Sequence, residues 1–250
     1  MQKAVQGTVP PSRSIGNNLL RVLNSADFSY VEPLLEPFRG TTGDVLYEPG
    51  DNVGHVYFPC DHAMVSYRVV LADGRSVETA LVGREGAIGG IISQGKVPAY
   101  ARAIVQFSGT FYRMPLSSLQ KAKEQSASIK YLFSRYADCL VAQIFQQTAC
   151  NATHSIEERT AKWLLSAIDR TGESEIALTQ EQLAGLLGVG RSYVSRVIQR
   201  LKADKVVEAR RSRLIVGNRA ALERLSCDCN LLVRRHFDDV LRGVYPRDSD

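Results

Sequence analysis

Residues 176–217 read IALTQEQLAGLLGVGRSYVSRVIQRLKADKVVEARRSRLIVG, and this stretch decides the fold of the C-terminal part of the chain. Thr179 is followed three positions later by Gln182, a capping-box pattern that predicts the start of a short helix. The sequence Gly-Val-Gly at 188–190 predicts a tight turn. Apolar residues at helical spacing then predict a second helix at 191–203. Two short helices joined in this way form a helix-turn-helix.

The end of the same stretch predicts a β-hairpin. Two β-rich runs, 206–208 and 214–216, are separated by the basic segment 209–213. A hairpin in this place is the wing of a winged helix-turn-helix, and a basic tip suits contact with backbone phosphates. The stretch therefore indicates a nucleic-acid-binding domain.

The second helix of this motif is expected to expose a face of hydrogen-bond donors. Arginine can bind guanine through two hydrogen bonds in the major groove, so this face is the candidate reading surface. The alternative left open is a protein-binding module whose arginines are only solvated. The candidate DNA contacts are Arg191, Ser192, Tyr193, Ser195, Arg196, Gln199 and Arg200 on the second helix, Thr179 at the start of the first, and Arg210, Arg211 and Arg213 on the wing.

The composition is that of a globular protein, with 44% hydrophobic and 23% charged residues in 250, which excludes disordered and fibrous classes. The net charge is +5, and within 155–219 there are 12 basic residues against 8 acidic ones, a surplus of 4. This local excess favours a polyanionic partner. Five cysteines without framework spacing, and an N-terminus without an apolar run, predict a cytoplasmic protein with no membrane contact.

Residues 38–114 consist of short β-rich runs punctuated by glycine. Eleven of the 19 glycines fall between Gly40 and Gly109, and Asp73-Gly74 is a hairpin signal between two of the runs. Many short strands at regular spacing predict a β-roll, barrel or sandwich.

Glycine is absent between 109 and 172, and the apolar spacing there becomes helical. A long helix is predicted at 126–152. Its apolar stripe either covers its own domain or pairs with a second copy, and we favour a homodimer seam because the short domain before it cannot easily bury the whole stripe. The residues of the stripe are Ile129, Phe133, Tyr136, Leu140 and Ile144.

We therefore predict an α+β protein with an N-terminal β-roll that is double-stranded and jelly-roll-like, a long dimerisation helix and a C-terminal winged helix-turn-helix with a helical extension. The extension is expected to pack on the winged domain. The predicted parts are a flexible tail (1–18), a β-roll sensor domain (19–125), the dimerisation helix (126–152), the winged helix-turn-helix (153–218) and the extension (219–250).

These parts, in this order, resemble the Crp/Fnr family of transcription regulators over roughly residues 19–217. The segment GREGAIGG at 83–90 is similar to the glycine-rich segment of the family's roll, and GRSYVSRVIQRL at 190–201 is similar to its recognition helix. The resemblance implies a homodimer that binds a near-palindromic site in double-stranded DNA. RNA polymerase is then a candidate partner, and an effector of unknown identity would reorient the DNA-binding heads about a hinge at 151–155.

Within the recognition helix the resemblance can be carried over residue by residue. Arg196 matches the family's base-contacting arginine, and Ser195 before it matches the Fnr branch. Arg191 matches an arginine of the cyclic-AMP-receptor branch. Ser192 stands where both branches carry glutamate, which implies an operator that differs at the position this glutamate reads.

The resemblance also implies an effector pocket in the roll. The family holds the ribose of a cyclic nucleotide with a glutamate and its phosphate with an arginine, but Gly90 and Ala99-Tyr100 occupy those positions here. A buried phosphate without its arginine is poorly compensated, so cyclic AMP is disfavoured. An Fnr-type iron–sulfur cluster is not expected either, because the first cysteine is Cys60. The candidate pocket residues are Gly89, Gly90, Ile91, Tyr100, Ala101 and Arg102.

Weaker signals leave alternatives open. Some relatives of the family bind haem, so His55 or His62 could be a ligand, although a satisfied loop histidine is favoured. Cys227 and Cys229 could bind a metal or oxidise, but no further pair lies beside them in the sequence. A structural feature of the helical tail is favoured, and no metal site is predicted.

No catalytic residue is predicted, because the chain lacks GxSxG, P-loop and HExxH motifs. The runner-up to an effector-sensing regulator is a ligand-independent regulator of the same fold, with the roll as scaffold. A third alternative is a cupin-like metalloenzyme fused to a helical domain, for which His55 and His62 lack a third ligand.

Overall fold

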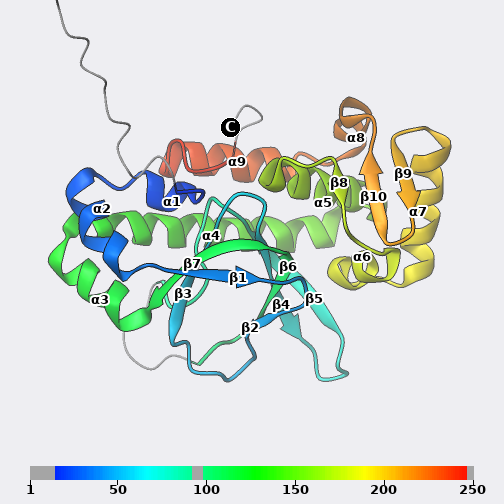
Figure 1. The fold of residues 1–250 in the computed structure, drawn as a ribbon. Helices are drawn as coiled ribbons and strands as arrows, with labels where there is room; N and C mark the ends of the chain where they lie inside the picture. The colour runs from blue at the N-terminus through cyan, green and yellow to red at the C-terminus, as the bar shows by residue number, and fades with distance from the viewer. Residues whose placement is uncertain (1–14, 92–97, 247–250) are drawn as a thin grey trace, which may run out of the picture.

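The computed structural model describes residues 15–91 and 98–246, in which a β-roll and a winged domain lie side by side along one long helix (Figure 1). This is the predicted α+β architecture. Within the described residues, none of the helices combines the length and hydrophobicity that a bilayer crossing needs.

In the part of the chain that the structure describes, the roll has two antiparallel sheets, one of three strands in the order β1-β7-β3 and one of four in the order β2-β6-β4-β5. Between residue 15 and the first strand lie the short helices α1 (Asn18–Arg21) and α2 (Ser25–Val31) and the 3-10 helix η2 (Glu32–Leu34). The strands are β1 (Glu36–Gly40), β2 (Val45–Tyr47), β3 (His55–Pro59), β4 (Met64–Val70), β5 (Ser76–Val82), β6 (Arg102–Phe107) and β7 (Gly109–Pro115).

Residues 15–18 correct the predicted tail, whose residues 1–14 lie outside the described part of the chain. Asn17 is fully buried, and its side-chain amide donates to Pro59 O at 2.8 Å and to Gly86 O at 2.9 Å. Its side-chain oxygen also accepts from Leu20 N and so caps α1. A buried amide with these three partners fixes the entry of the chain into the roll.

After α3 (Leu116–Gln125), the long helix α4 (Ala127–Thr153) begins at its capping residue Ser126. Its first half covers the chain's own roll. Ile129, Phe133 and Tyr136 are at most 1% exposed, and Tyr136 Oη donates to Ala87 O at 3.1 Å. The prediction of these three as dimer-seam residues is therefore wrong, because the roll already buries them.

The second half of α4 carries apolar side chains that the chain itself does not cover. Leu140 is still partly buried against the roll, whereas Ile144 is 36% exposed and Phe145 70% exposed. Val141 lies beside them and is 39% exposed. The apolar face of α4 therefore has two parts: a first half that the roll covers, and a second half, called here the open half, that is exposed.

The winged domain is built on α5, which begins with a capping box between Ser155 and Glu158 and ends at Gly172 in the left-handed conformation. Its core joins Trp163, Leu183, Val194, Ile198 and Leu214 with their neighbours. The elements are α5 (Ile156–Thr171), β8 (Glu175–Ile176), α6 (Gln180–Leu187), α7 (Arg191–Ala203), β9 (Val207–Arg210) and β10 (Arg213–Val216), with the sheet order β8-β10-β9.

The C-terminal extension packs only in part on the winged domain. Its first helix, α8 (Arg219–Leu225), lies against α5, but α9 (Cys229–Val240) runs back along α4 toward the roll (Figure 1). Phe237 and Tyr245 join the hydrophobic core of the roll, and Asn18 Nδ2 donates to Val244 O at 2.9 Å. The prediction is corrected accordingly: α9 ties the two domains together.

Two buried carboxylates of the roll bind the winged domain. Glu78 on β5 accepts hydrogen bonds from Trp163 Nε1 at 2.8 Å and from Ser66 Oγ at 2.7 Å. Glu85 accepts from Arg170 Nε at 2.7 Å, and both side chains of this ion pair are 2% exposed. Burial raises the pKa of Glu78 despite its two donors. These contacts hold α5 against the roll in one orientation.

Replacing Arg170 by methionine is expected to lower the free energy of unfolding by about 3–5 kcal/mol, because Glu85 is left as an unpaired buried charge. The only tryptophan of the chain, Trp163, lies at the same interface, so its fluorescence during urea unfolding measures the change. The double variant Arg170→Met with Glu85→Gln removes both charges and is expected to recover much of the loss. A single variant as stable as the parent would contradict this account.

Candidate nucleic-acid interface

The turn before α7 fixes the direction of that helix. Gly188 ends α6 with φ of 67°, and its N–H bonds the carbonyl oxygens of Ala184 and Gly185. A Cβ at this glycine would meet Val77 Cγ2 at 3.0 Å. Both the backbone conformation and the tight space therefore favour glycine at the first position of the turn.

Helix α7 presents the predicted reading face to solvent at the end of the molecule away from the roll (Figure 1). Val194, Ile198 and Leu201 are fully buried at intervals of four and three residues, which fixes the rotation of the helix. Ser195 is half-buried at the edge of the face. The exposed members are Arg191, Ser192, Tyr193, Arg196, Gln199 and Arg200.

The arginines of this face make contacts that a nucleic acid can replace. Arg191 pairs with Glu181 at 3.7 Å, and Arg200 pairs with Glu157 at 2.9 Å. These pairs are solvent-exposed at their arginines, so each contributes little stability. The Arg196 guanidinium lies 4.8 Å from the centre of the Tyr193 ring. Stacking uses the flat face of the guanidinium, and its N–H edge remains suited to a planar acceptor.

The wing extends the basic surface beyond α7. Arg210 pairs with Glu208 at 3.1 Å, and Arg213 pairs with Glu175 on β8. Arg211 and Ser212 form the tip between β9 and β10, and both are exposed. The structure thus brings the predicted arginines of helix and wing into one domain, with Arg211 at the end of the hairpin.

Thr179 has a structural task in addition to its predicted DNA contact. Its hydroxyl accepts from Gln182 N at 3.1 Å, while Gln182 Oε1 accepts from Thr179 N at 2.8 Å. This reciprocal capping box positions the start of α6, as the sequence predicts.

The predicted effector residues fall into two segments with different neighbours. A Cβ at Gly90 would lie 2.4 Å from Leu116 Cδ1, so a side chain cannot replace the glycine without moving this leucine. Gly89 has φ of 95°, and its N–H donates to Tyr67 Oη at 3.1 Å. Ile91 is buried beside this segment.

The second segment, residues 100–102, is partly exposed to solvent and contacts the end of β2 through Glu48. Tyr100 is 84% exposed, Ala101 is half-buried, and Arg102 Nε donates to Glu48 Oε2 at 2.8 Å. The arginine nearest to the family's phosphate-binding position is therefore engaged by a carboxylate of its own roll.

The roll interior itself holds aromatic side chains. The ring of Tyr57 lies 5.3 Å from Phe38 and 5.9 Å from Tyr47, in edge-to-face arrangements. Burial raises the pKa of Tyr67 to about 12, which keeps its hydroxyl neutral. Tyr47 and Tyr57 are both buried, so these rings form part of the core of the roll.

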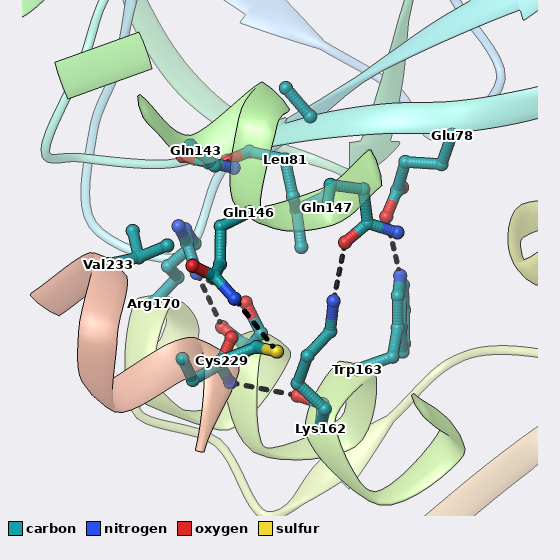
Figure 2. A pocket seen from close by; sticks show the side chains of 13 residues that line it. Glu78, Leu81, Gln143, Gln146, Gln147, Lys162, Trp163, Arg170, Cys229 and Val233 are labelled. Carbon is teal, nitrogen blue, oxygen red and sulfur yellow. Dashed lines mark hydrogen bonds between the residues drawn. The ribbon is translucent and has the colours of Figure 1, made fainter. Parts of the chain in front are cut away.

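Sequence reasoning missed a small polar cavity between β5, α4, α5 and α9, shown in Figure 2. Its volume is about 30 Å³, enough for about one or two waters. Gln146 and Gln147 from α4 and Lys162 from α5 point into it, and Lys162 donates to Gln147 Oε1. The cavity lies between the two domains, and no sequence motif indicates a cavity there.

The two histidines considered as metal ligands lie apart from each other, as the sequence favours. His62 Nδ1 lies against Thr171 O, whereas His55 packs beside Tyr57, so the two rings do not share a site.

Cys227 and Cys229 do have further candidate ligands beside them, Cys150 and His154, which lie more than 70 residues earlier. The hydrogen bond between Cys150 and Cys227 lowers the pKa of the Cys150 thiol. Because the four residues come from two distant segments, no local sequence pattern brings them together.

The fold and the exposed face of α7 define a winged helix-turn-helix protein with a β-roll partner domain. Comparison with family models agrees: residues 158–225 match the Crp-like helix-turn-helix domain. No curated protein matches the chain in sequence.

Solved structures share the fold. FixK2 from Bradyrhizobium japonicum is 20% identical with a TM-score of 0.65, over 77% of this chain and 98% of that one. The c-di-GMP responsive global regulator CLP from Xanthomonas campestris is 17% identical with a TM-score of 0.61, over 77% and 99%. A putative Crp/Fnr transcriptional regulator from Eubacterium rectale is 18% identical with a TM-score of 0.60, over 83% and 96%. The chain thus has a Crp-like helix-turn-helix domain within the fold of the Crp/Fnr transcription regulators, which confirms the resemblance.

Replacing Gly188 by alanine is expected to destabilise the protein by about 1–2 kcal/mol, because a Cβ disfavours the left-handed conformation and crowds Val77. Gly185 offers a matched control three residues earlier, since nothing lies within 4 Å of its Cβ position inside α6. Alanine there is expected to stabilise by up to about 1 kcal/mol. Thermal unfolding of both variants tests the pair, and equal effects would contradict the assignment.

Proposed function

We propose that this chain is a sequence-specific DNA-binding transcription regulator of the Crp/Fnr type. The observation that carries the proposal is the exposed face of α7, where arginines and short polar side chains lie opposite a fully buried apolar face. A helix with this face can enter the major groove, with its N-terminal residues at the base edges. The match of 158–225 to the Crp-like domain supports the same function.

Two roles are assigned within the surface. Arg196 and Arg191 bind base edges, with guanine as the favoured partner, and Ser192 and Ser195 reach bases or phosphates. Arg211, at the wing tip, binds the DNA backbone without reading the sequence. The helix thus provides sequence specificity, and the wing adds affinity that does not depend on sequence.

The regulator is proposed to act as a homodimer on a near-palindromic site, because two recognition helices then enter successive major grooves. The seam differs from the one read from the sequence. It uses the open half of α4, where Val141, Ile144 and Phe145 are exposed, and not the half that the roll covers. RNA polymerase remains a candidate partner.

The signal that controls the regulator is proposed not to be cyclic AMP. Leu116 occupies the space beside Gly90, and Glu48 engages Arg102. A different effector would act by favouring one arrangement of the heads about the junction at His154 and Ser155, where α4 ends and α5 begins. Control by abundance, with the roll as scaffold, is the second candidate.

Arg196→Ala is expected to weaken binding to the specific site by about 1–3 kcal/mol and to relax its sequence preference, because a two-bond contact with a base is lost. Arg211→Ala is expected to weaken binding to all sequences and to reduce the salt slope by about 1, because one phosphate contact is lost. The operator is first selected from random duplexes, and fluorescence anisotropy then gives both affinities over a range of salt.

The two variants serve as controls for each other, since both remove an exposed arginine. Equal losses on specific and random DNA for Arg196→Ala would contradict its assignment to base reading. Failure of the parent protein to prefer any duplex would reject the proposed function.

Phe145→Glu is expected to raise the dimer dissociation constant at least about 30-fold, since a central aromatic in an interface often contributes about 2 kcal/mol. Leu232→Glu on α9 is the control, because Leu232 is also exposed, at 48%, but lies outside the proposed seam. Analytical ultracentrifugation measures both. A Phe145→Glu protein that dimerises as tightly as the parent would rule out this seam.

A further inference from the structure

Four candidate metal ligands from two distant parts of the chain meet where α4 ends and α9 begins. Cys150 lies in the last turn of α4, and His154 is its C-terminal capping residue. Cys227 precedes α9, and Cys229 is the first residue of that helix. The three cysteines are at most 8% exposed and form a cluster of their own, separate from the two hydrophobic cores.

Two of the distances among the four ligand atoms match those of a tetrahedral metal site. Cys150 Sγ lies 3.7 Å from Cys227 Sγ, and Cys229 Sγ lies 3.6 Å from His154 Nδ1. All four atoms lie within 4.8 Å of one another. Zinc bonds of about 2.3 Å to sulfur and about 2.0–2.1 Å to nitrogen give tetrahedron edges of about 3.8 Å and about 3.6 Å. Little movement would be needed to close the site on an ion.

We propose that Cys150, His154, Cys227 and Cys229 bind one zinc ion in a structural Cys3His site. Three thiolates and one imidazole are a ligand set that zinc takes in closed, four-coordinate sites. Cys150 and His154 are four residues apart, so they project from the same side of the helix end.

Nearby cations suit the charge that such a site would carry. Binding releases the three thiol protons, and one zinc ion with three thiolates and a neutral imidazole has a net charge of −1. Arg159 is 8% exposed, and its Nε is buried without a hydrogen-bond partner in the described structure. Lys162 is 7% exposed and interacts electrostatically with Cys150. Both cations interact electrostatically with the thiol cluster, so they would balance the charge of an anionic metal centre.

Side chains around the cluster already hold the ligands in place. Gln146 Nε2 donates to Cys229 Sγ at 3.1 Å (Figure 2). Asn230, next to this cysteine, donates to Lys162 O at 2.9 Å, which fixes the start of α9 on α5. Hydrogen bonds to ligand atoms orient metal ligands and tune their affinity.

Two other chemistries fit the geometry less well. A disulfide between Cys150 and Cys227 would require their sulfurs to approach from 3.7 Å to about 2.0 Å and would leave His154 without a role. An iron–sulfur cluster spreads its four ligands over different irons, so they could not all lie within 4.8 Å of one another as they do here. A single ion is the occupant that these distances favour.

A zinc ion here would join two elements at the junction between the domains. It would hold the end of α4 and the start of α9 together, next to the first turn of α5. The metal would thus set how far the winged domain can turn relative to α4. The metal site itself does not depend on DNA binding.

The experiment measures metal in the purified full-length protein without a histidine tag. Elemental analysis is expected to find about one zinc per chain. Stripping with a chelator under reducing conditions is expected to lower the melting temperature, and added zinc but not magnesium to restore it. Cobalt added to the stripped protein is expected to give the intense visible absorption of a tetrahedral thiolate site.

Variants identify the ligands. Cys150→Ser, Cys227→Ser and His154→Ala are each expected to lose the zinc or to alter the cobalt spectrum. Cys139→Ala is the matched control, because Cys139 is a fully buried cysteine of the same helix that lies in the roll core, and it is expected to keep the zinc. Gln146→Leu is expected to weaken zinc affinity about 10–100-fold with the spectrum retained.

Circular dichroism of each variant separates ligand loss from misfolding, and the stripped parent tests the site without any substitution. No zinc in the parent and no cobalt spectrum after reduction would overturn the proposal. So would a Cys150–Cys227 disulfide in protein prepared under reducing conditions, or iron in place of zinc. DNA affinity is measured separately, because metal binding at this cluster and DNA binding at α7 can fail independently of each other.

Discussion

The arrangement of the molecule depends on one buried guanidinium. Arg170 of α5 binds Glu85 of the roll and lies 5.1 Å from the ring of Tyr245 in the C-terminal segment. Three regions far apart in the sequence thus meet at a single side chain. Taking such a pair out of water offsets much of its electrostatic attraction, so its main effect is on which arrangement is adopted, not on overall stability. An unpaired Glu85 in this position would be costly, and this restricts the orientations that the winged domain can take.

The sequence predicts the structure correctly where the determining residues lie close together along the chain. The capping box at Thr179, the turn at Gly188 and the buried spacing of α7 each depend on neighbours a few residues away. α6 begins after its predicted cap, and α7 spans the predicted residues 191–203. The exposed position of Arg196 follows from that spacing alone.

The predictions failed where two distant segments compete for the same surface. The apolar spacing of α4 is the same whether its own roll or a second copy of the chain covers the helix. In the structure the roll covers Phe133 but not Phe145. The extension reads as an amphipathic helix, but its hydrophobicity does not say that Phe237 packs in the core of the roll. Cys150 and Cys227 meet only because α9 returns along α4. The spacing of residues in the sequence does not show which distant segment will pack against a helix.

The same contacts bear on how a signal could pass from roll to head. Any rotation of the winged domain about the junction at His154 must separate Trp163 from Glu78, because these residues lie on opposite sides of the interface. Separation removes the Trp163–Glu78 hydrogen bond, which disfavours the rotated arrangement. It also returns the Glu78 carboxylate to water, which favours that arrangement, so the two contributions to the free energy oppose each other. The net difference between the two arrangements can therefore be small even though each contact is buried. A small difference is what an effector or partner needs, because a ligand shifts an equilibrium only by its differential affinity for the two states. The polar lining of the interface, with Gln147 and Lys162 beside a cavity of about 30 Å³, suits such a boundary better than an apolar one, since polar groups can exchange protein partners for water when the domains part.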